Sequence, residues 1–157
     1  MPKISNIEIL EIPKQPILSI RVQTSVQDLP KRIGAGYGQM GEYLKKEGKY
    51  LSGVPYVAFH SFSDMTDMDV EIGFQIAEPL SGAGEIKAGI IPAGKVVSCM
   101  YLGPYSQMEP FYNEIMDWIF KNGYEPTFPS YEFYYNGPGV PEEYYLTEVR
   151  IPIRRKE

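Results

Sequence analysis

Two glutamates stand out because each lies within an aromatic or apolar stretch that is typical of a β-strand. Glu132 occurs in SYEFYYN and Glu148 in LTEVRIPI. A carboxyl group walled by aromatic rings loses hydrating water, and this loss raises its pKa. As an anion it could pair with a cationic aromatic ligand, and with a raised pKa it could act as a general acid or base. Each glutamate could instead lie on the solvent face of its strand and pair with a neighbour such as Arg150.

Classical catalytic and metal-binding arrangements lack the residues they need. His60 is the single histidine and Cys99 the single cysteine. A catalytic triad would have to be built on His60, and nothing near it resembles a nucleophile elbow. The chain has no group of histidines and cysteines at metal-binding spacing. We therefore expect no metal site and no cofactor.

The segment 36–41, GYGQMG, formally matches the dinucleotide fingerprint GxGxxG. The fingerprint works where a strand turns directly into a helix and an acidic residue follows about 20 positions later. Here the glycines lie inside a helical pattern that begins near Asp28, and no acid follows near His60. We therefore expect a helix without nucleotide binding. Its glycines either permit a close backbone approach or leave the helix locally mobile.

Composition and charge exclude several classes of protein. The chain has 157 residues, of which 43% are apolar and 22% charged, as in ordinary globular domains. Its net charge of −5 opposes a direct nucleic-acid partner, because phosphate binding needs clustered lysine and arginine. The N-terminus has no apolar signal segment, and no run of 18 apolar residues occurs. With a single cysteine, these features predict a cytoplasmic protein that does not enter a membrane.

The first half of the chain predicts two strands, a helix and two further strands. Asp28 can cap the helix and Pro30 falls in its first turn. An apolar stripe then recurs at helical spacing, comprising Ile33, Tyr37, Met40 and Leu44. The predicted strands are 7–12, 17–24, 55–60 and 68–77. We interpret the segment 78–85 as a connector.

The second half repeats this order. A strand over 94–102 precedes a capping box at Ser106–Glu109. The helix that follows has its own apolar stripe, comprising Met108, Phe111, Tyr112, Ile115 and Ile119. Asn122 and Gly123 indicate its end. The closing strands are 129–135 and 144–153, joined by a turn at 136–139.

Superposing the two halves places Pro55 on Pro129 and Glu71 on Glu148. A half-domain of this size can bury its helix face only against a partner like itself. We therefore predict an α+β fold in which duplicated β-α-β-β units form a curved antiparallel sheet with two main helices. The whole chain, 1–157, is expected to be one domain, with repeats at about 5–78 and 86–155.

Four stretches in this order resemble the GyrI-like small-molecule-binding family, which includes the effector-binding domains of AraC-type and MerR-type multidrug regulators. They are Tyr101–Tyr105, Trp118–Glu125, Tyr131–Tyr134 and Thr147–Pro152. The resemblance implies a duplicated SHS2-type fold with a pocket lined by aromatic rings around an acidic residue, which receives lipophilic cations. Glu132 and Glu148 both match acidic positions of the family, and either could face the ligand.

We predict that aromatic side chains line this pocket beside the glutamates, namely Trp118, Tyr112, Phe133, Tyr134 and Tyr37. Tyr37 comes from the first half, where the glycine-rich helix departs from the family's common pattern. The expected partner is thus a small-molecule ligand. The sequence leaves a homodimer open.

Three functions follow as hypotheses. The first is a stand-alone module that binds lipophilic aromatic compounds, cations included, for sensing, sequestration or drug resistance. The first strand begins at about Ile7, so we expect no DNA-reading helix-turn-helix before it. The second is a hydrolase that opens cyclopropane rings of alkylating natural products, as described for some members of the family, with Glu148 or Glu132 activating water. The third is a protein-interaction or inhibitor module that uses exposed tyrosines.

Overall fold

The computed structural model describes residues 3–61, 64–136 and 139–157 and confirms the predicted α+β class. Antiparallel strands and, among the described residues, two main helices make up the fold. The chain divides into two compact units. Unit 1 combines the residues up to Ile12 with Gly94–Glu157, and unit 2 is Pro13–Ala93. Each unit carries one of the two helices, α2 in unit 1 and α1 in unit 2.

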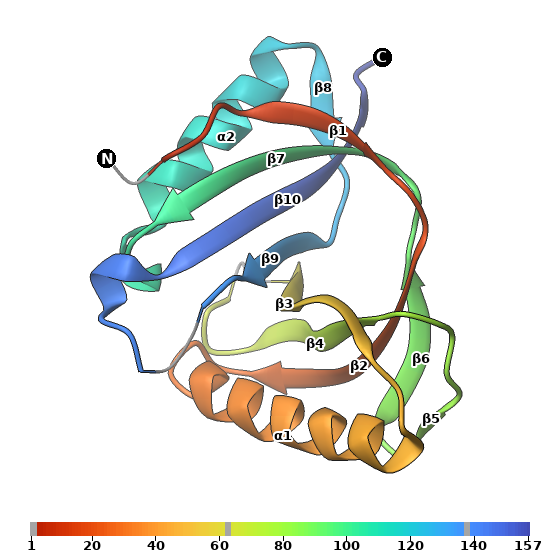
Figure 1. The fold of residues 1–157 in the computed structure, drawn as a ribbon. Helices are drawn as coiled ribbons and strands as arrows, with labels where there is room; N and C mark the ends of the chain where they lie inside the picture. Colours follow the sequence, from red (N-terminus) through yellow and green to blue (C-terminus); the bar gives the residue numbers. More distant parts are fainter. Residues whose placement is uncertain (1–2, 62–63, 137–138) are drawn as a thin grey trace. The chain divides into compact units, whose positions relative to one another are not determined.

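Unit 2 is a helix packed on an antiparallel sheet with the strand order β3-β4-β2-β6-β5. Its elements are β2 (Gln15–Thr24), α1 (Leu29–Glu47), β3 (Leu51–Ser61), β4 (Met68–Ile76), β5 (Gly82–Ala83) and β6 (Ile86–Ile91). The helix α1 lies against β4 and β2 (Figure 1).

Unit 1 has the same general plan with the strand order β1-β7-β10-β9, and β8 pairs with the far end of β10. Its elements are β1 (Glu8–Ile12), β7 (Gly94–Leu102), the 3-10 helix η1 (Tyr105–Gln107), α2 (Glu109–Lys121), β8 (Tyr124–Pro126), β9 (Ser130–Tyr134), the 3-10 helix η2 (Glu142–Tyr144) and β10 (Leu146–Arg155). The helix α2 packs on β7 and β8 (Figure 1).

The two units exchange one strand each. β1 comes directly before β2 in sequence but pairs with β7, where Ile9 lies opposite Val97. β6 comes directly before β7 but pairs with β2, where Ile17 lies opposite Gly89. The compact units therefore do not coincide with the predicted sequence repeats. β1 belongs to unit 1 although it directly precedes β2, and β6 belongs to unit 2 although it directly precedes β7.

The glycine-rich segment lies inside α1, as predicted. Asp28 is the N-cap residue, but its side chain makes no capping hydrogen bond, and Gly48 ends the helix with a φ of 65°. A Cβ at Gly36 would lie 3.1 Å from Ile72 Cγ2, so this glycine permits a close approach of helix and sheet. The remaining glycines of the segment have nothing within 4 Å of a built Cβ and are Gly34, Gly38 and Gly41.

The predicted capping box at the start of α2 is wrong. Ser106 lies in η1, Glu109 is the first residue of α2, and no side chain caps the helix at Met108. Glu109 still suits this position because a carboxylate in the first turn interacts favourably with the helix dipole. The predicted stop is confirmed, since α2 ends at Lys121 and Gly123 has a φ of 83°.

The strands β5 and β6 fall where no strand was predicted. The segment expected to be a connector contains β5, and β6 follows it directly. Only the two ends of β6, Ile86 and Ile91, are buried, so its sequence lacks the apolar alternation that reveals a strand. The predicted turn at 136–139 includes residues 137–138, which lie outside the described part of the chain.

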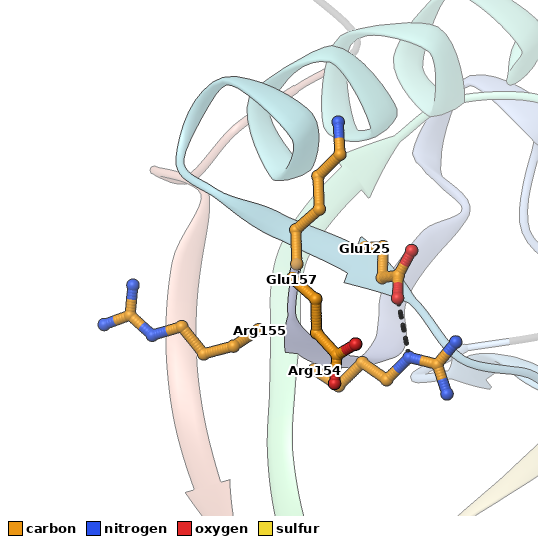
Figure 2. Close-up of a pocket in the computed structure, with 5 residues that line it drawn as sticks. Glu125, Arg154, Arg155 and Glu157 are labelled. Carbon is orange, nitrogen blue, oxygen red and sulfur yellow. Dashed lines mark hydrogen bonds and ion pairs between the residues drawn. The ribbon is translucent and has the colours of Figure 1, made fainter.

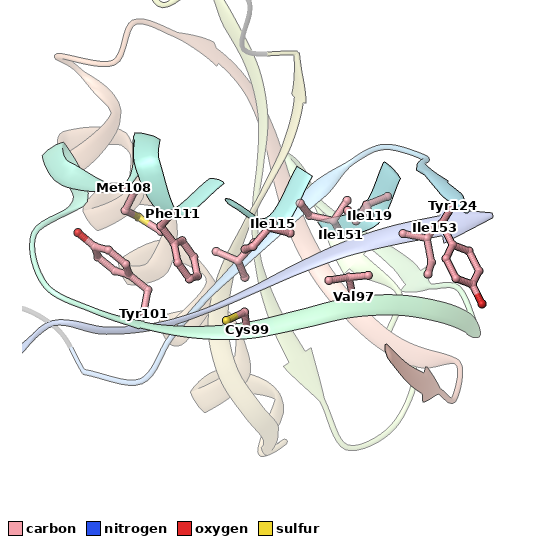
Figure 3. Close-up of a cluster of buried hydrophobic side chains, with 11 residues drawn as sticks. Val97, Cys99, Tyr101, Met108, Phe111, Ile115, Ile119, Tyr124, Ile151 and Ile153 are labelled. Atoms are coloured by element: carbon pink, nitrogen blue, oxygen red, sulfur yellow. The ribbon is translucent and has the colours of Figure 1, made fainter. Parts of the chain in front are cut away.

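The core of unit 1 fills the space between α2 and the strands β7 and β10 (Figure 3). The buried cluster comprises Val97, Cys99, Tyr101, Met108, Phe111, Ile115, Ile119, Tyr124, Val149, Ile151 and Ile153. Burying each large apolar side chain contributes about 1.5–3 kcal/mol, so this layer provides most of the driving force that holds α2 on the sheet. Among the described residues, no helix combines the length and apolar character needed to cross a bilayer.

Candidate functional site

The strand pair β9–β10 places the two candidate glutamates on opposite faces of the sheet. Glu132 lies opposite Val149, and Glu148 lies opposite Phe133. Directly paired residues of an antiparallel sheet point to the same face, and successive residues alternate. Val149 belongs to the core beneath α2. Glu132 therefore faces α2, whereas Glu148 faces away from it.

Glu132 is buried and held by two tyrosine hydroxyls. Only 7% of the residue is exposed to solvent. Tyr112, on α2, donates a short hydrogen bond to Oε2, and Tyr134, on β9, donates one of 2.9 Å to Oε1. The structure thus brings together three of the residues that the sequence predicted for the site, from a helix and from the strand on which the helix packs.

The surroundings of Glu132 favour its neutral form. Burial raises the pKa of this carboxyl, and the hydrogen bonds from Tyr112 and Tyr134 oppose the rise only in part. Within the described residues, no lysine, arginine or histidine forms an ion pair with Glu132. Burial and the adjacent carboxylate also raise the pKa of Tyr112 well above its usual value. Glu132 is thus a buried acid that no cationic side chain of the described residues accompanies.

Two further tyrosines complete an aromatic group around this carboxyl. Tyr105 stacks on Tyr145 with ring centroids 5.0 Å apart and meets the ring of Tyr134 edge-on at 5.5 Å. Burial, with smaller effects of Glu132 and Tyr145, raises the pKa of Tyr105 to about 12. We use the name Glu132 cluster for five residues, namely Glu132, Tyr112, Tyr134, Tyr105 and Tyr145.

Sequence reasoning missed two members of the Glu132 cluster, Tyr105 and Tyr145. Tyr105 ends the stretch YLGPY and begins η1, and Tyr145 lies between η2 and β10. Both lie outside the α-helices and strands, where periodicity carries no information about the direction of a side chain. The spacing of Tyr105 from the start of the second helix is the signal that could have identified it.

Glu148 is also buried, but it is already paired. It accepts hydrogen bonds from Ser98 at 2.7 Å and Tyr135 at 2.8 Å, and Arg150 Nε lies 2.7 Å from Oε2. Burial alone would raise the pKa of Glu148, but Arg150, Ser98 and Tyr135 together outweigh it and lower the pKa. The predicted alternative of pairing with Arg150 therefore holds for Glu148, although the pair lies on a buried face.

The remaining predicted site residues are Phe133, Trp118 and Tyr37. Phe133 is on the Glu148 face, where the Arg150 guanidinium lies 4.7 Å from its ring centroid. Trp118 is half-buried on α2 and packs against the core of unit 1. Tyr37 belongs to unit 2, where its hydroxyl donates to the Tyr56 carbonyl at 2.8 Å.

Unit 2 carries a polar group of its own on the face away from α1. Tyr56 donates a hydrogen bond of 2.5 Å to Glu71, and His60 Nε2 lies 3.0 Å from the other carboxylate oxygen. The Tyr56 ring occupies the space above Gly73, where a Cβ would come within 2.4 Å of the ring. Both oxygens of Glu71 are thus engaged by neighbouring side chains.

The strand register shows that the predicted superposition of the two halves is wrong by one residue where β3 is matched to β9. Ala58 lies opposite Glu71, and Phe133 lies opposite Glu148. If Glu71 and Glu148 are equivalent, Ala58 then matches Phe133, so Pro55 matches Ser130 and not Pro129. Matching Pro55 to Pro129 was wrong because Pro129 lies just before the first residue of β9.

A hollow of about 410 Å³ lies at the C-terminal end of β10 (Figure 2). Its lining is charged and comprises Glu125, Arg154, Arg155, Lys156 and Glu157. An ion pair of 2.8 Å between Glu125 and Arg154 crosses part of it (Figure 2). None of the predicted site residues lines this hollow, which lacks the apolar walls typical of a site for an aromatic ligand.

Sites for small organic molecules are lined mainly by apolar and aromatic side chains with a few polar groups, and the Glu132 cluster has this composition. The sequence profile of the GyrI-like small molecule binding domain matches residues 5–154. The chain therefore belongs to the GyrI-like small-molecule-binding family. Comparison with curated protein sequences finds no match.

Solved structures with the same fold include three proteins. The EcmrR C-terminal domain superposes with a TM-score of 0.80 at 24% identity, over 96% of this chain and 98% of that domain. In the EcmrR–DNA complex the TM-score is 0.83 at 24% identity and 97% of this chain is covered, but the match spans only 58% of the EcmrR chain. A hydrolase from Listeria innocua gives 0.71 at 16% identity, over 98% of this chain and 94% of that one. SAV2435 bound to tetraphenylphosphonium gives 0.68 at 13% identity, over 96% and 94%.

Proposed function

We propose that this small-molecule-binding domain receives lipophilic aromatic cations at the Glu132 cluster. The observation that carries the proposal is the burial of Glu132 among tyrosines, with no cationic side chain beside it in the described part of the chain. A buried carboxylate is costly unless a positive charge accompanies it. A cationic ligand would supply that charge, and the tyrosine rings would add cation–π attraction.

Glu148 is less suited to this role because its charge is already compensated. Arg150 makes two contacts with its carboxylate, at 2.7 and 3.3 Å. A ligand cation would have to displace Arg150 or share the carboxylate with it. The pairing favours a structural role for Glu148 in holding β10 against β7 through Ser98.

The family and one structural relative support the proposed ligand class. The domain belongs to a small-molecule-binding family, and the SAV2435 structure contains tetraphenylphosphonium, a lipophilic aromatic cation. At 13% identity this likeness supports a shared fold, and the ligand class rests on the chemistry of the Glu132 cluster. Binding of this kind would serve sensing, sequestration or resistance to toxic cations.

Calorimetric titration with tetraphenylphosphonium and with a planar aromatic dye cation tests the proposal. We expect saturable binding to the full chain and a loss of affinity of at least about tenfold in Glu132→Gln, because the counter-charge is removed. Glu148→Gln serves as the matched control and should retain affinity within about twofold. Equal affinities of the wild type and Glu132→Gln for both cations would overturn the proposal.

A second candidate is hydrolysis of a bound ligand, which the raised pKa of Glu132 favours. A carboxyl group with a raised pKa can exchange a proton with an attacking water or with the leaving group. We propose cyclopropane-bearing alkylators as the substrates to test. Ring-opened product that disappears in Glu132→Gln would support catalysis, whereas stoichiometric binding without product would exclude it.

A further inference from the structure

The two units differ in a specific way at four equivalent positions between helix and sheet. Strand register makes Val57 in unit 2 equivalent to Glu132 in unit 1, since the former lies opposite Ile72 and the latter opposite Val149. By the same register the remaining pairs are Phe59 with Tyr134, Val70 with Thr147, and Pro55 with Ser130. Positions that are apolar in unit 2 are therefore polar in unit 1.

This replacement lies on the helix-facing side of β9 and β10. Val57 and Val70 are both 0% exposed, which is typical of core positions beneath a helix. At the equivalent positions Glu132 is 7% exposed and Thr147 is 0% exposed. Burying polar groups in a layer that the other unit fills with valine costs free energy, so the polar groups need a reason other than packing.

Two of these polar groups have hydroxyls for which the described residues supply no hydrogen-bond partner of good geometry. Within the described residues, neither Ser130 Oγ nor Thr147 Oγ1 has a hydrogen-bond partner, although both atoms are buried. The Ser130 hydroxyl lies close enough to Tyr112 to lower its pKa, but it forms no hydrogen bond of good geometry. A buried hydroxyl left unpaired is destabilising, and buried polar groups in proteins usually have a partner in the protein or in ordered water.

The hydroxyls flank Glu132 along the strand direction. Ser130 precedes Glu132 by two residues on the same face of β9, a spacing of roughly 7 Å. Thr147 lies opposite Tyr134 on β10 and is thus a diagonal neighbour of Glu132, again at roughly 7 Å between backbones. The result is a row of three polar groups whose middle member is the carboxylate.

We propose that Ser130 and Thr147 are hydrogen-bonding subsites on either side of Glu132, so that the ligand is an aromatic cation bearing amino or hydroxyl groups. This inference rests on the proposed function of the Glu132 cluster. A hydroxyl can accept from an N–H group of the ligand and donate to a ligand oxygen. Cations whose surface is purely hydrocarbon leave both hydroxyls unpaired and bind more weakly for that reason.

The test compares two cations on the full chain, a planar phenanthridinium with ring amino groups and tetraphenylphosphonium, which has no hydrogen-bond donor. Thr147→Val is the key variant because Val70 occupies the equivalent position of unit 2 without exposure. We expect it to weaken binding of the amino-substituted cation about three- to tenfold and to leave tetraphenylphosphonium within about twofold. Ser130→Ala should act in the same direction.

Ser98→Ala is the matched control, because the Ser98 hydroxyl lies on the other face of the sheet and bonds to Glu148. It should leave the ratio of the two affinities unchanged. The melting temperature of ligand-free Thr147→Val should equal or exceed that of the wild type, since an unpaired hydroxyl is removed. A lower melting temperature of Thr147→Val, together with an unchanged ratio of the affinities for the two cations, would indicate that the hydroxyl binds a structural water. That result would overturn the inference.

The outcomes also separate this inference from the proposed function. If neither cation binds the wild type, the Glu132 cluster is not a cation site. If both bind, depend on Glu132, and lose affinity equally in Thr147→Val, then only the assignment of the two subsites fails.

Discussion

Glu132 and Glu148 sit on neighbouring strands, one residue out of register and on opposite faces of the sheet. Glu132 lies opposite Val149, while Glu148 lies opposite Phe133. The two carboxyls therefore meet different partners, two tyrosines in one case and an arginine in the other. Because the partners differ, the pKa values of the two groups shift in opposite directions.

Replacing Glu132 by glutamine should stabilise the protein, increasingly so as pH rises. The folded state raises the pKa of Glu132 above its usual value near 4.5, so stability that is present below this value is lost as pH rises through the folded pKa. Glutamine does not titrate. Urea unfolding of Glu132→Gln and the wild type between pH 4 and 8 should show a difference that grows with pH, by about 1.4 kcal/mol per unit of pKa shift. A difference that stays flat across this range would contradict the assignment.

Glu148→Gln should show the opposite sign. The folded state lowers the pKa of Glu148, so its contribution is present above the usual value near 4.5 and is lost as pH falls through the folded pKa. Removing its charge leaves Arg150 partly buried without a counter-ion. We expect a loss of about 3 kcal/mol or less at pH 7, shrinking in acid, because the Arg150 side chain is 24% exposed. A variant as stable as the wild type at pH 7 would show that the pair contributes nothing.

Tyr112→Phe keeps the ring beside Glu132 but removes the hydroxyl that donates to its carboxylate. The anion then loses one of its two tyrosine donors, so the pKa of Glu132 should rise further. The anionic form that a cation needs is then less stable, and affinity for an aromatic cation should fall about fivefold. Tyr135→Phe, which removes a hydrogen bond to Glu148 instead, is the control and should leave affinity unchanged. Carboxyl titration by NMR gives the pKa independently.

The sequence predicted the long strands and both helices because their apolar patterns are strong. The stripe on α2 places Phe111, Ile115 and Ile119 correctly in the core, and the predicted strand 68–77 matches β4. The pairing of β1 with β7 and of β6 with β2 could not be predicted from the sequence. The tertiary fold decides these pairings, and the apolar pattern of neither β1 nor β6 distinguishes one partner strand from another. The prediction of a capping box was wrong because Ser106 lies in η1, before the α-helix begins, and so is not the N-cap residue.

For the candidate site the sequence predicted a set of residues and left their arrangement open. Tyr112 and Tyr134 were named beside both glutamates, and the structure places their hydroxyls on Glu132. The choice between Glu132 and Glu148 depends on which face each occupies, and the one-residue shift in the superposed halves hid that difference. The hydroxyls of Ser130 and Thr147 gave no signal, since serine and threonine in strands are usually paired or exposed.

Tyr105 should govern how quickly a ligand leaves the Glu132 cluster. Its ring is 45% exposed, yet it stacks on Tyr145 and meets Tyr134, so it lies between solvent and the buried carboxyl. Tyr105→Ala removes one wall, and we expect dissociation of an aromatic cation to accelerate about three- to tenfold. Tyr144→Ala, at a ring that is 58% exposed in η2, is the control for removing a surface tyrosine. Stopped-flow dissociation rates that are equal in the two variants would remove Tyr105 from the site.

Gly73→Ala tests whether the Tyr56–Glu71 contact holds unit 2 together. A Cβ at this position would lie 2.4 Å from Cζ and Oη of Tyr56, whose ring is fully buried and whose hydroxyl bonds to Glu71 at 2.5 Å. The ring must move, and the displacement should cost about 1–3 kcal/mol of unfolding free energy. Gly38→Ala is the matched control because a Cβ there meets nothing within 4 Å and alanine favours a helix, so it should stabilise by up to about 1 kcal/mol. Equal unfolding free energies in urea for Gly73→Ala and the wild type would mean that Tyr56 has another position of similar energy, and that Glu71 does not depend on this contact.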